Sequence, residues 1–299
     1  MTHTRSVTRR GLIRAGVATS VAVAGLAASP ASAGTVGVDE QLQELEGTHG
    51  ARLGVFARNV RTGREVAYRA HERFAMCSTF KTVVAAAVLR DHDRCAPLDA
   101  VVHFPPADIL PNSPVSGPRV DSGITVGEAC RGAIQYSDNT AGNLLLRQVG
   151  GPAGLTRFLR SIGDDVSRLD RWETELNAAV PGDLRDTTTP DAMGRTYERL
   201  MLGRALSRGD REQLVTWLKG NTTSAQRFRA GLPQGWVLGD KTGTGAYASA
   251  HDVGVAWTTR GTPVVLSVLS SKDTPDAPVT NALIADTARI LAAALAPGE

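Results

Sequence analysis

Short apolar runs, separated by polar turns, lie near both ends of the chain. They predict five β-strands, over residues 51–60, 65–68, 236–240, 253–259 and 264–269. The middle of the chain shows helical patterns between loops rich in Pro and Gly. Strands at both ends around a helical middle imply one sheet built from both termini, with an inserted helical domain.

The helical pattern is strongest from Ser78 through Arg90. Residues 83–89 of this segment are apolar on every side, so the helix is expected to lie inside the protein. Further helices are predicted over residues 141–149, 189–206, 211–218 and 281–294.

The first 33 residues have the pattern of an export signal. Four arginines and no acid precede an apolar run from Ala15 to Ala28, and Ala31-Ser32-Ala33 has the small-x-small pattern of a cleavage site. This run is shorter than the roughly 20 residues that span a bilayer, so a retained membrane anchor is the weaker interpretation. The pair Arg9-Arg10 resembles a twin-arginine signal, and the mature protein is therefore expected outside the cytoplasm.

Composition and charge exclude several classes of function. The 299 residues are 42% hydrophobic and 21% charged, which rules out wholesale disorder. The formal net charge of +3 comes from the leader, because the rest carries 29 basic and 30 acidic side chains. No basic run remains to favour nucleic acid. Three cysteines, with no Cys-x-x-Cys pair, predict neither a disulfide framework nor a zinc site, and we expect no metal or cofactor.

Lysine is rare in this chain, which has 29 Arg and only 4 Lys. Lys81 follows Ser78 by three residues, so the amine and the hydroxyl share one face of the predicted helix. The alternative is a serine N-cap followed by a surface lysine. A capping box would place Glu or Gln at that position, however, and burial near the positive helix end favours a neutral amine. Such an amine can act as the base beside a serine nucleophile.

Two further motifs follow in order along the chain. Ser137-Asp138-Asn139 precedes the helix over residues 141–149, and by itself it also suits a turn and an N-cap. Lys241-Thr242-Gly243-Thr244-Gly245 ends a strand, and its glycines permit close approach by a ligand, although alone it also suits a polar strand edge. The chance of all three motifs occurring in this order by accident is on the order of 1 in 10,000.

Together these motifs resemble those of the class A serine β-lactamases, and the resemblance covers essentially the whole mature chain. It implies a mixed α/β (α+β) fold with a mainly antiparallel five-stranded sheet flanked by helices. It also implies a sheet domain of residues 34–76 plus 221–299, and an all-helical domain of residues 77–220. The segment Arg171-Trp172-Glu173-Thr174-Glu175-Leu176-Asn177 is similar to the signature of the family's Ω loop, here residues 171–186. The active site is expected between the two domains.

The resemblance also implies a role for each site residue. Ser78 attacks the lactam carbonyl, and either Lys81, or Glu173 through a water, accepts its proton. Ser137 passes a proton to the departing ring nitrogen, and Glu173 activates the hydrolytic water. Substrate contacts are expected from Asn139, Asn177, Lys241, Thr242, Gly243, Thr244 and Arg227. The oxyanion hole is expected from the backbone N–H groups of Ser78 and Thr244.

Several positions need the structure to decide them. Arg227 matches a carboxylate-binding arginine of some relatives, but it also suits a solvated surface site. Arg171 and Asp186 are expected to close the neck of the Ω loop as an ion pair. Thr174 stands where many relatives have proline after the glutamate, and Asn112 stands where many have an aromatic residue at the rim of the site.

The sequence thus predicts a secreted, monomeric hydrolase of β-lactam antibiotics. Two other functions suit the same fold. One is a D,D-peptidase acting on cell-wall peptides, against which Glu173 in an Ω-loop setting argues. The other is a β-lactam sensor or sequestering protein that is acylated without turnover. Cys77 beside the nucleophile is expected to be a buried free thiol, because Gly245 stands at the position of its partner in bridged relatives.

Overall fold

The computed structural model describes residues 37–91 and 97–299, which form one compact unit. The predicted leader and Cys95 lie outside these ranges.

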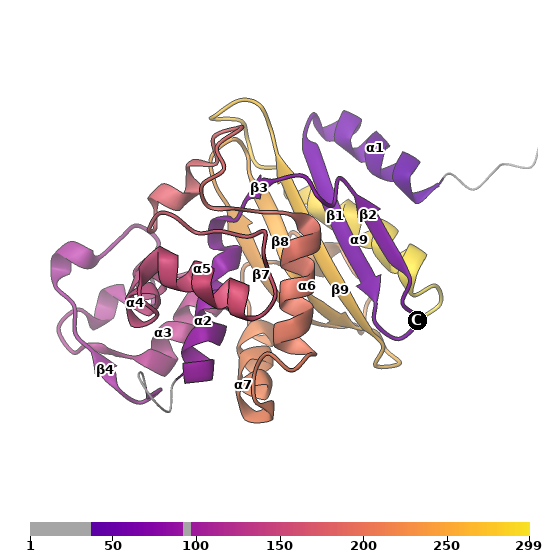
Figure 1. The fold of residues 1–299 in the computed structure, drawn as a ribbon. Helices are drawn as coiled ribbons and strands as arrows, with labels where there is room; N and C mark the ends of the chain where they lie inside the picture. Colours follow the sequence, from indigo (N-terminus) through magenta and orange to yellow (C-terminus); the bar gives the residue numbers. More distant parts are fainter. Residues whose placement is uncertain (1–36, 92–96) are drawn as a thin grey trace, which may run out of the picture. The chain divides into compact units, whose positions relative to one another are not determined.

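A five-stranded antiparallel sheet is the framework of this unit (Figure 1). The strand order is β2-β1-β9-β8-β7, so the N-terminal β1 pairs with the C-terminal β9. This arrangement confirms the prediction that both ends of the chain build one sheet. The strands are β1 (Arg52–Asn59), β2 (Glu65–Tyr68), β7 (Val237–Thr244), β8 (Ala250–Trp257) and β9 (Pro263–Ser271).

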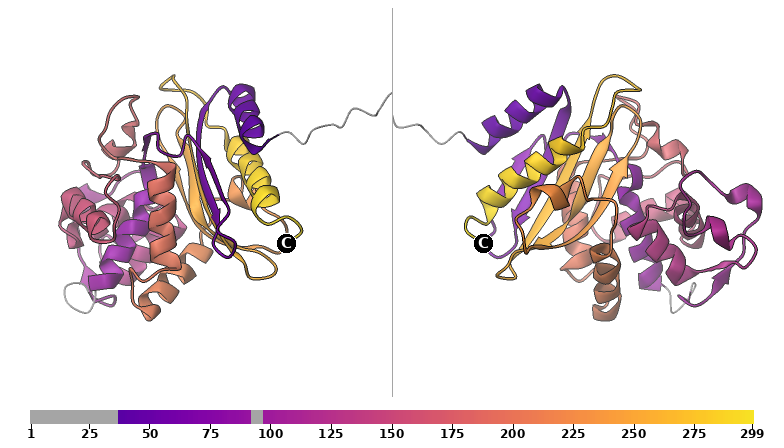
Figure 2. Two further views of the ribbon diagram at one scale, coloured as in Figure 1. Left: turned by 45° about the vertical axis from the view of Figure 1, so that its right-hand side comes forward. Right: turned by 180° about the vertical axis from the view of Figure 1, so that it is seen from behind.

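Helices cover both faces of the sheet, as the two views of Figure 2 show. On one face, α1 (Val38–His49) and α9 (Asn281–Leu295) pack in a cluster that includes Leu53 and Val55 of β1. On the other face α6 (Pro190–Met201) packs against β1, β8 and β9. Since successive side chains of a strand point to opposite faces, Phe56 of β1 belongs to the second core.

Helix α2 (Phe80–Asp91) lies at the centre of the helical part. Its residues from Phe80 to Leu89 are all buried, which confirms the expectation of an internal helix. Four helices pack around it, namely α3 (Val126–Gln135), α4 (Asn139–Gln148), α5 (Gly151–Ser161) and α7 (Arg208–Lys219).

Short elements connect these parts. The two-residue strands β3 (Phe74–Ala75) and β6 (Thr187–Thr188) pair with each other, as do β4 (Val101–Val102) and β5 (Ile124–Thr125). The single-turn helix α8 (Phe228–Gly231) precedes β7. Short 3₁₀ turns are η1 (Cys77–Thr79), η2 (Pro106–Asp108), η3 (Gly117–Arg119) and η4 (Glu175–Ala178).

Several boundaries differ from the predictions, and two of them have a clear physical reason. Helix α2 begins at Phe80, because Ser78 belongs to the 3₁₀ turn η1. Helix α6 ends at Met201, five residues before the predicted end at Leu206. Strand β7 continues past Asp240 to Thr244, because its polar C-terminal residues also pair with β8.

Two features are absent from the described ranges, a helix that could cross a membrane and a cluster of metal-ligating side chains. None of the helices there is long and apolar enough to cross a membrane. No set of three metal-ligating side chains lies together in the same part of the chain.

Candidate active site

Ser78 lies in the 3₁₀ turn η1, directly before the buried helix α2. Tyr197 fixes this turn, because its hydroxyl donates to the carbonyl of Thr79 at 2.9 Å and bonds Thr82 Oγ1 at 2.8 Å. Cys77 has a φ of 45°, in the left-handed region. The Ser78 side chain is therefore held at a fixed place, with only 7% of the residue exposed.

Lys81 Nζ is the centre of a group of polar atoms. It donates to Ser78 Oγ at 3.0 Å, to the Ser137 carbonyl at 2.8 Å and to Asn139 Oδ1 at 2.6 Å. Glu173 Oε1 lies 2.9 Å from the same nitrogen, and Ser78 Oγ donates to this oxygen at 3.4 Å. Lys81 is fully buried, so the alternative of a surface lysine is wrong and the predicted pairing with Ser78 is confirmed.

Asp138 fixes the segment Ser137-Asp138-Asn139. It is the N-cap of α4, because its Oδ1 accepts the Ala141 N–H at 2.8 Å, as the motif predicted. Its other oxygen accepts the N–H groups of Val115 and Ser116, both at 2.9 Å. Ser137 has a φ of 56°. Because Asp138 holds both sides of this turn, Ser137 and Asn139 face Lys81.

Lys241 reaches the same turn from strand β7. Its Nζ donates to Ser137 Oγ at 3.1 Å and to the Thr242 carbonyl at 2.8 Å. Burial, and then the positive charge of Lys81, lower the pKa of Lys241 to about 7. Ser137 Oγ thus lies between two buried amines, through which a proton can move.

Arg227 is buried, so the interpretation as a solvated surface residue is wrong. Its Nη1 donates to the carbonyls of Gly243 and His251, both at 2.7 Å, and its Nη2 donates to Thr244 Oγ1 at 2.7 Å. Nε donates to Asn281 Oδ1 at 2.8 Å. The guanidinium therefore lies directly behind the end of β7.

The Ω loop places Glu173 opposite Ser78. Asn177 Nδ2 donates to Glu173 Oε2 at 2.5 Å, and the side chain of Asn143 bonds both the N–H and the carbonyl of Glu173, each at 3.0 Å. The Glu173–Thr174 peptide bond is cis. These contacts fix a buried carboxylate between Lys81 and Asn177.

An ion pair closes the neck of this loop, as expected. Arg171 Nε lies 2.5 Å from Asp186 Oδ2, and Asp186 Oδ1 accepts the N–H groups of Asp170 and Arg171. The carbonyl of Asp186 also accepts the Met76 N–H at 2.7 Å. The neck is therefore tied to the chain two residues before the nucleophile.

A cleft of about 270 Å³ opens above these groups. Asn112 stands at its mouth, where its Nδ2 donates to the Ser137 carbonyl at 3.1 Å, and no aromatic side chain occupies that position. The residues that line the cleft are Ser78, Asn112, Tyr136, Ser137, Asn139, Asn177, Thr223, Arg227, Thr242 and Thr244.

The sequence analysis missed two residues of this site. Asn143 lies one helical turn after Asn139 on α4, so i, i+4 spacing could have indicated that both lie on the face of α4 toward the site. Thr223 Oγ1 lies 2.5 Å from Thr242 Oγ1, but nothing in the local sequence around residue 223 indicates that contact.

Cys77 is a buried free thiol, as predicted, and so is Cys130. A Cβ built on Gly245 would lie 2.8 Å from Cys77 Sγ, so the two positions face each other. Burial raises the pKa of the Cys77 thiol, which makes it a poor nucleophile.

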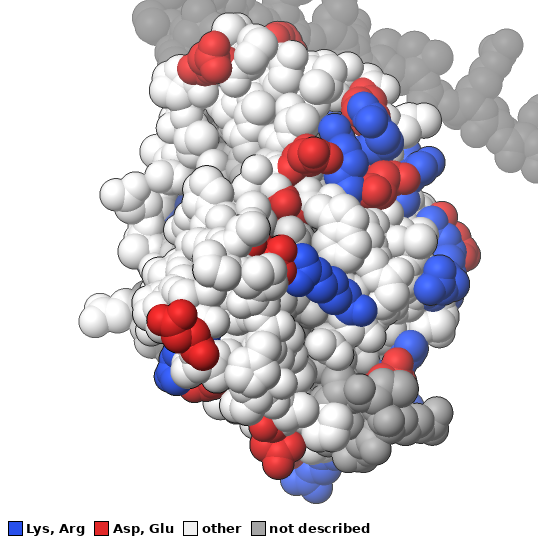
Figure 3. Space-filling view, turned by 90° about the vertical axis from the view of Figure 1, so that its left-hand side faces the viewer, with Lys and Arg blue, Asp and Glu red and all other residues white. Residues whose placement is uncertain are grey.

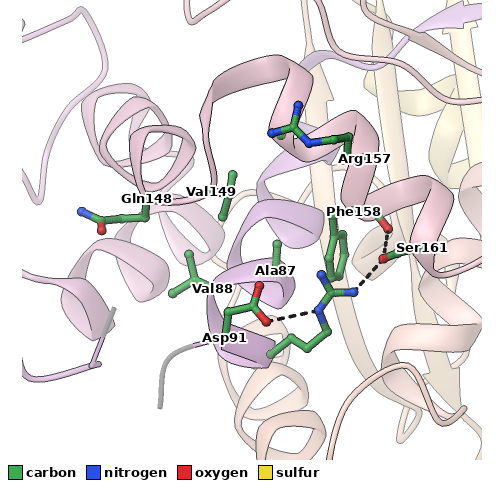
Figure 4. A pocket seen from close by; sticks show the side chains of 10 residues that line it. Ala87, Val88, Asp91, Gln148, Val149, Arg157, Phe158 and Ser161 are labelled. Carbon is green, nitrogen blue, oxygen red and sulfur yellow. Dashed lines mark hydrogen bonds and ion pairs between the residues drawn. The ribbon is translucent and has the colours of Figure 1, made fainter. Parts of the chain in front are cut away.

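A larger cavity formed by described residues lacks such a group of reactive side chains. It has a volume of about 360 Å³ and lies among α2, α4 and α5 (Figure 4). In it Arg90 bonds Ser161 Oγ and pairs with Asp91, leaving no activated nucleophile. On the face shown in Figure 3, acidic and basic side chains are interspersed and form no continuous positive area.

Comparisons with known proteins agree with this geometry. A model of the "Beta-lactamase enzyme family" matches residues 37–295. A β-lactamase of Streptomyces fradiae is 51% identical, and the match covers 96% of each chain.

Solved structures are similar over the same region. The β-lactamase of Streptomyces albus G has a TM-score of 0.84 and 51% identity, over 86% of this chain and 99% of that one. A class A β-lactamase described as the last common ancestor of Gram-negative bacteria has a TM-score of 0.83 and 51% identity, over 86% of this chain and 98% of that one. The chain therefore belongs to the class A family of β-lactamases, enzymes that hydrolyse the β-lactam ring.

Proposed function

We propose that hydrolysis proceeds through an acyl-enzyme on Ser78. The observation that carries this proposal is the position of Lys81 Nζ, within 3.0 Å of Ser78 Oγ and of the Glu173 carboxylate. Ser78 Oγ forms a bond to the lactam carbonyl carbon as its proton passes to Lys81, or through a water to Glu173. The C–N bond then breaks, and the ring nitrogen takes a proton from Ser137.

The proposed substrate contacts lie around the end of β7. Lys241, Thr242 and Thr244 bind the carboxylate of the substrate, with Arg227 behind them as a second positive charge. Asn139 binds the side-chain amide, Asn177 lines the same cleft next to Glu173, and Gly243 allows the substrate to approach the strand closely. The N–H groups of Ser78 and Thr244 form the oxyanion hole, where one donor typically contributes about 3 to 4 kcal/mol.

Deacylation is assigned to Glu173. Asn177 and Glu173 hold a water against the ester, and the carboxylate accepts a proton as this water attacks. The carboxylic acid product leaves and Ser78 regains its proton. The position of the Glu173 carboxylate supports this role, since its Oε1 lies 3.4 Å from Ser78 Oγ and its Oε2 accepts from Asn177.

The cleaved leader, the location, the oligomeric state and the domain division of the enzyme are also proposals. Residues 1–33 form a cleaved leader with a twin-arginine signal, and the enzyme acts outside the cytoplasm as a monomer. Its active site lies between the sheet domain (34–76 plus 221–299) and the helical domain (77–220), as the resemblance implies.

Mass spectrometry tests the nucleophile. A chromogenic cephalosporin in excess should lose its chromophore with many turnovers, and a rapidly quenched sample should carry the adduct on a peptide that contains Ser78. Ser78→Ala should form no adduct, whereas the control Ser122→Ala, outside the cleft, should behave as wild type. An adduct on another residue would overturn the assignment.

A separate experiment tests the leader. Replacing Arg9 and Arg10 by lysine keeps the charge and removes the arginine pair that a receptor reads. Activity in the medium or periplasm should be lost while activity in lysed cells stays. Unchanged export would contradict the twin-arginine route.

A further inference from the structure

Two buried aspartates lie behind the two cations proposed to attract the substrate carboxylate, Lys241 and Arg227. We call these two residues the carboxylate-binding wall. Asp240 precedes Lys241 in β7, and Asp252 of β8 is the register partner of Thr242. Neither residue is exposed to solvent, and their carboxyl groups lie within hydrogen-bonding reach of each other. Two ionised carboxylates have only acceptor oxygens, so a hydrogen bond between them requires a proton on one of them.

The remaining contacts show which carboxyl holds that proton. Asp240 Oδ2 accepts from Asn221 Nδ2 at 2.7 Å, and Arg229 Nη2 lies 3.6 Å from Asp240 Oδ1. Asp252 Oδ2 accepts a single bond, from the Phe228 N–H at 3.1 Å. In each carboxyl Oδ1 is buried and accepts no hydrogen bond from a donor within the described residues, as expected if these two atoms share the proton.

The electrostatic surroundings of the two carboxyl groups agree with the number of hydrogen-bond donors that each faces. Burial raises the pKa of both carboxyls, and the negative charge of Asp240 raises that of Asp252 well above its ordinary range. The positive groups that act on the pair are Arg229 on the side of Asp240 and Arg227 on the side of Asp252, together with Lys241. Asp240, with the stronger set of donors, is the ionised member.

This proton sets the charge of the wall. Lys241 and Arg227 are both buried, and neither has a carboxylate within ion-pair distance in the ranges that the structure describes. The negative charges that act on both are those of Asp240 and Asp252. If the two aspartates carry one negative charge between them, the two cations of the wall keep a net positive charge. Two ionised aspartates would leave the wall neutral.

We propose that Asp252 is a neutral carboxylic acid that donates its proton to ionised Asp240, and that this pair keeps the wall of Lys241 and Arg227 positive for an anionic substrate. The inference rests on the proposed role of that wall. Asp252 is a positioning residue, since it also holds the Phe228 N–H next to Arg227.

Infrared difference spectroscopy tests the protonation directly. With ¹³C-labelled aspartate, wild type minus Asp252→Asn should show the C=O band of a protonated carboxyl at neutral pH. No such band in wild type would overturn the proposal. Should the variant fail to fold, the wild-type spectrum decides alone, because the band should persist through neutral pH only if a buried carboxyl stays protonated.

Kinetics test the consequence for substrate choice. The ratio of KM for the methyl ester to KM for the free carboxylate of one penicillin measures the preference of the wall for an anion. Asp252→Asn replaces a neutral acid with a neutral amide, so this ratio should change by less than about threefold. If Asp252 were ionised, the substitution would remove a buried charge beside the substrate carboxylate, and the ratio would change by more than about tenfold.

Asp240→Asn is the matched variant. It places an amide where Asn221 and Arg229 both present donors, so it should alter kcat/KM for the carboxylate substrate more than Asp252→Asn does. The reverse order would overturn the assignment. Equal KM values for acid and ester in wild type would instead refute the proposed wall, which separates the two failures.

Discussion

Glu173→Gln isolates the water-activating step, because glutamine keeps the size of the side chain and removes its basicity. Loss of a general base slows a step by about 10² to 10⁴-fold, which is roughly 3 to 5 kcal/mol of barrier. One carboxylate oxygen lies 2.9 Å from Lys81 Nζ and the other 2.5 Å from Asn177 Nδ2, so the new amide must turn its NH₂ toward one of these donors. This mismatch should lower the free energy of unfolding by about 1 to 3 kcal/mol.

The assay for this variant is intact-protein mass spectrometry after mixing with a penicillin. Glu173→Gln should gain the mass of one substrate and keep it, with a burst equal to the enzyme concentration. If Glu173 also accepts the first proton through a water, the adduct forms more slowly but still accumulates. The control is Glu175→Gln, at an exposed glutamate two residues away. Turnover of the Glu173 variant at the wild-type rate, without any adduct, would refute the deacylation role.

Three further predictions concern charge and burial. Because Lys241 has a pKa of about 7, kcat/KM for a carboxylate substrate should fall as the pH rises through that value. Lys241→Arg stays charged, so it should flatten this fall between about pH 6 and 9. A pH profile of the variant identical to that of wild type would contradict the role of the Lys241 charge. Burial, and then the positive charge of Arg227, lower the pKa of His251 to about 3. Between about pH 3 and 6.5 the native state therefore binds fewer protons than the unfolded state, so the free energy of unfolding should fall as the pH falls through this window. Urea unfolding of His251→Gln should therefore show a smaller loss between neutral and acid pH, and an equal loss would show that another group is responsible. Asp186→Asn breaks the buried pair at the neck, so urea unfolding should show about 3 kcal/mol less stability and deacylation should slow; wild-type stability would contradict the structural role of the neck.

Much of the fold could be predicted because its apolar runs are clearly separated by polar turns. The buried segment from Val83 to Leu89 required an internal helix, and strands at both ends of the chain required a shared sheet. Helix α1 was missed, because Leu42 is its single buried residue and its sequence is mostly polar. The predicted range of β7 stopped at Asp240 for a related reason, since Lys241-Thr242-Gly243-Thr244 contains no apolar side chain yet pairs fully with β8.

The site was predictable only as far as its motifs are local. Ser78 and Lys81 are one turn apart, so their contact follows from helical spacing. The burial of Arg227 could not be predicted, because the carbonyls of Gly243 and His251 that hold it come from two strands further along the chain. The bond between Asp240 and Asp252 depends on strand register, which the sequence alone does not specify.

Residues 34–299 are nearly neutral overall, yet the site concentrates positive charge. Lys81, Lys241 and Arg227 are all buried, and a buried charge costs stability unless it is paired. Lys81 is paired with Glu173, whereas Lys241 and Arg227 donate mainly to neutral oxygens and share the charge of one aspartate pair behind them. That incomplete compensation is unfavourable in the free enzyme and is relieved when an anion enters the cleft. Binding of the substrate carboxylate should therefore stabilise the fold as well as orient the lactam, and a β-lactam ester should raise the melting temperature of an acylation-deficient variant less than the free acid does.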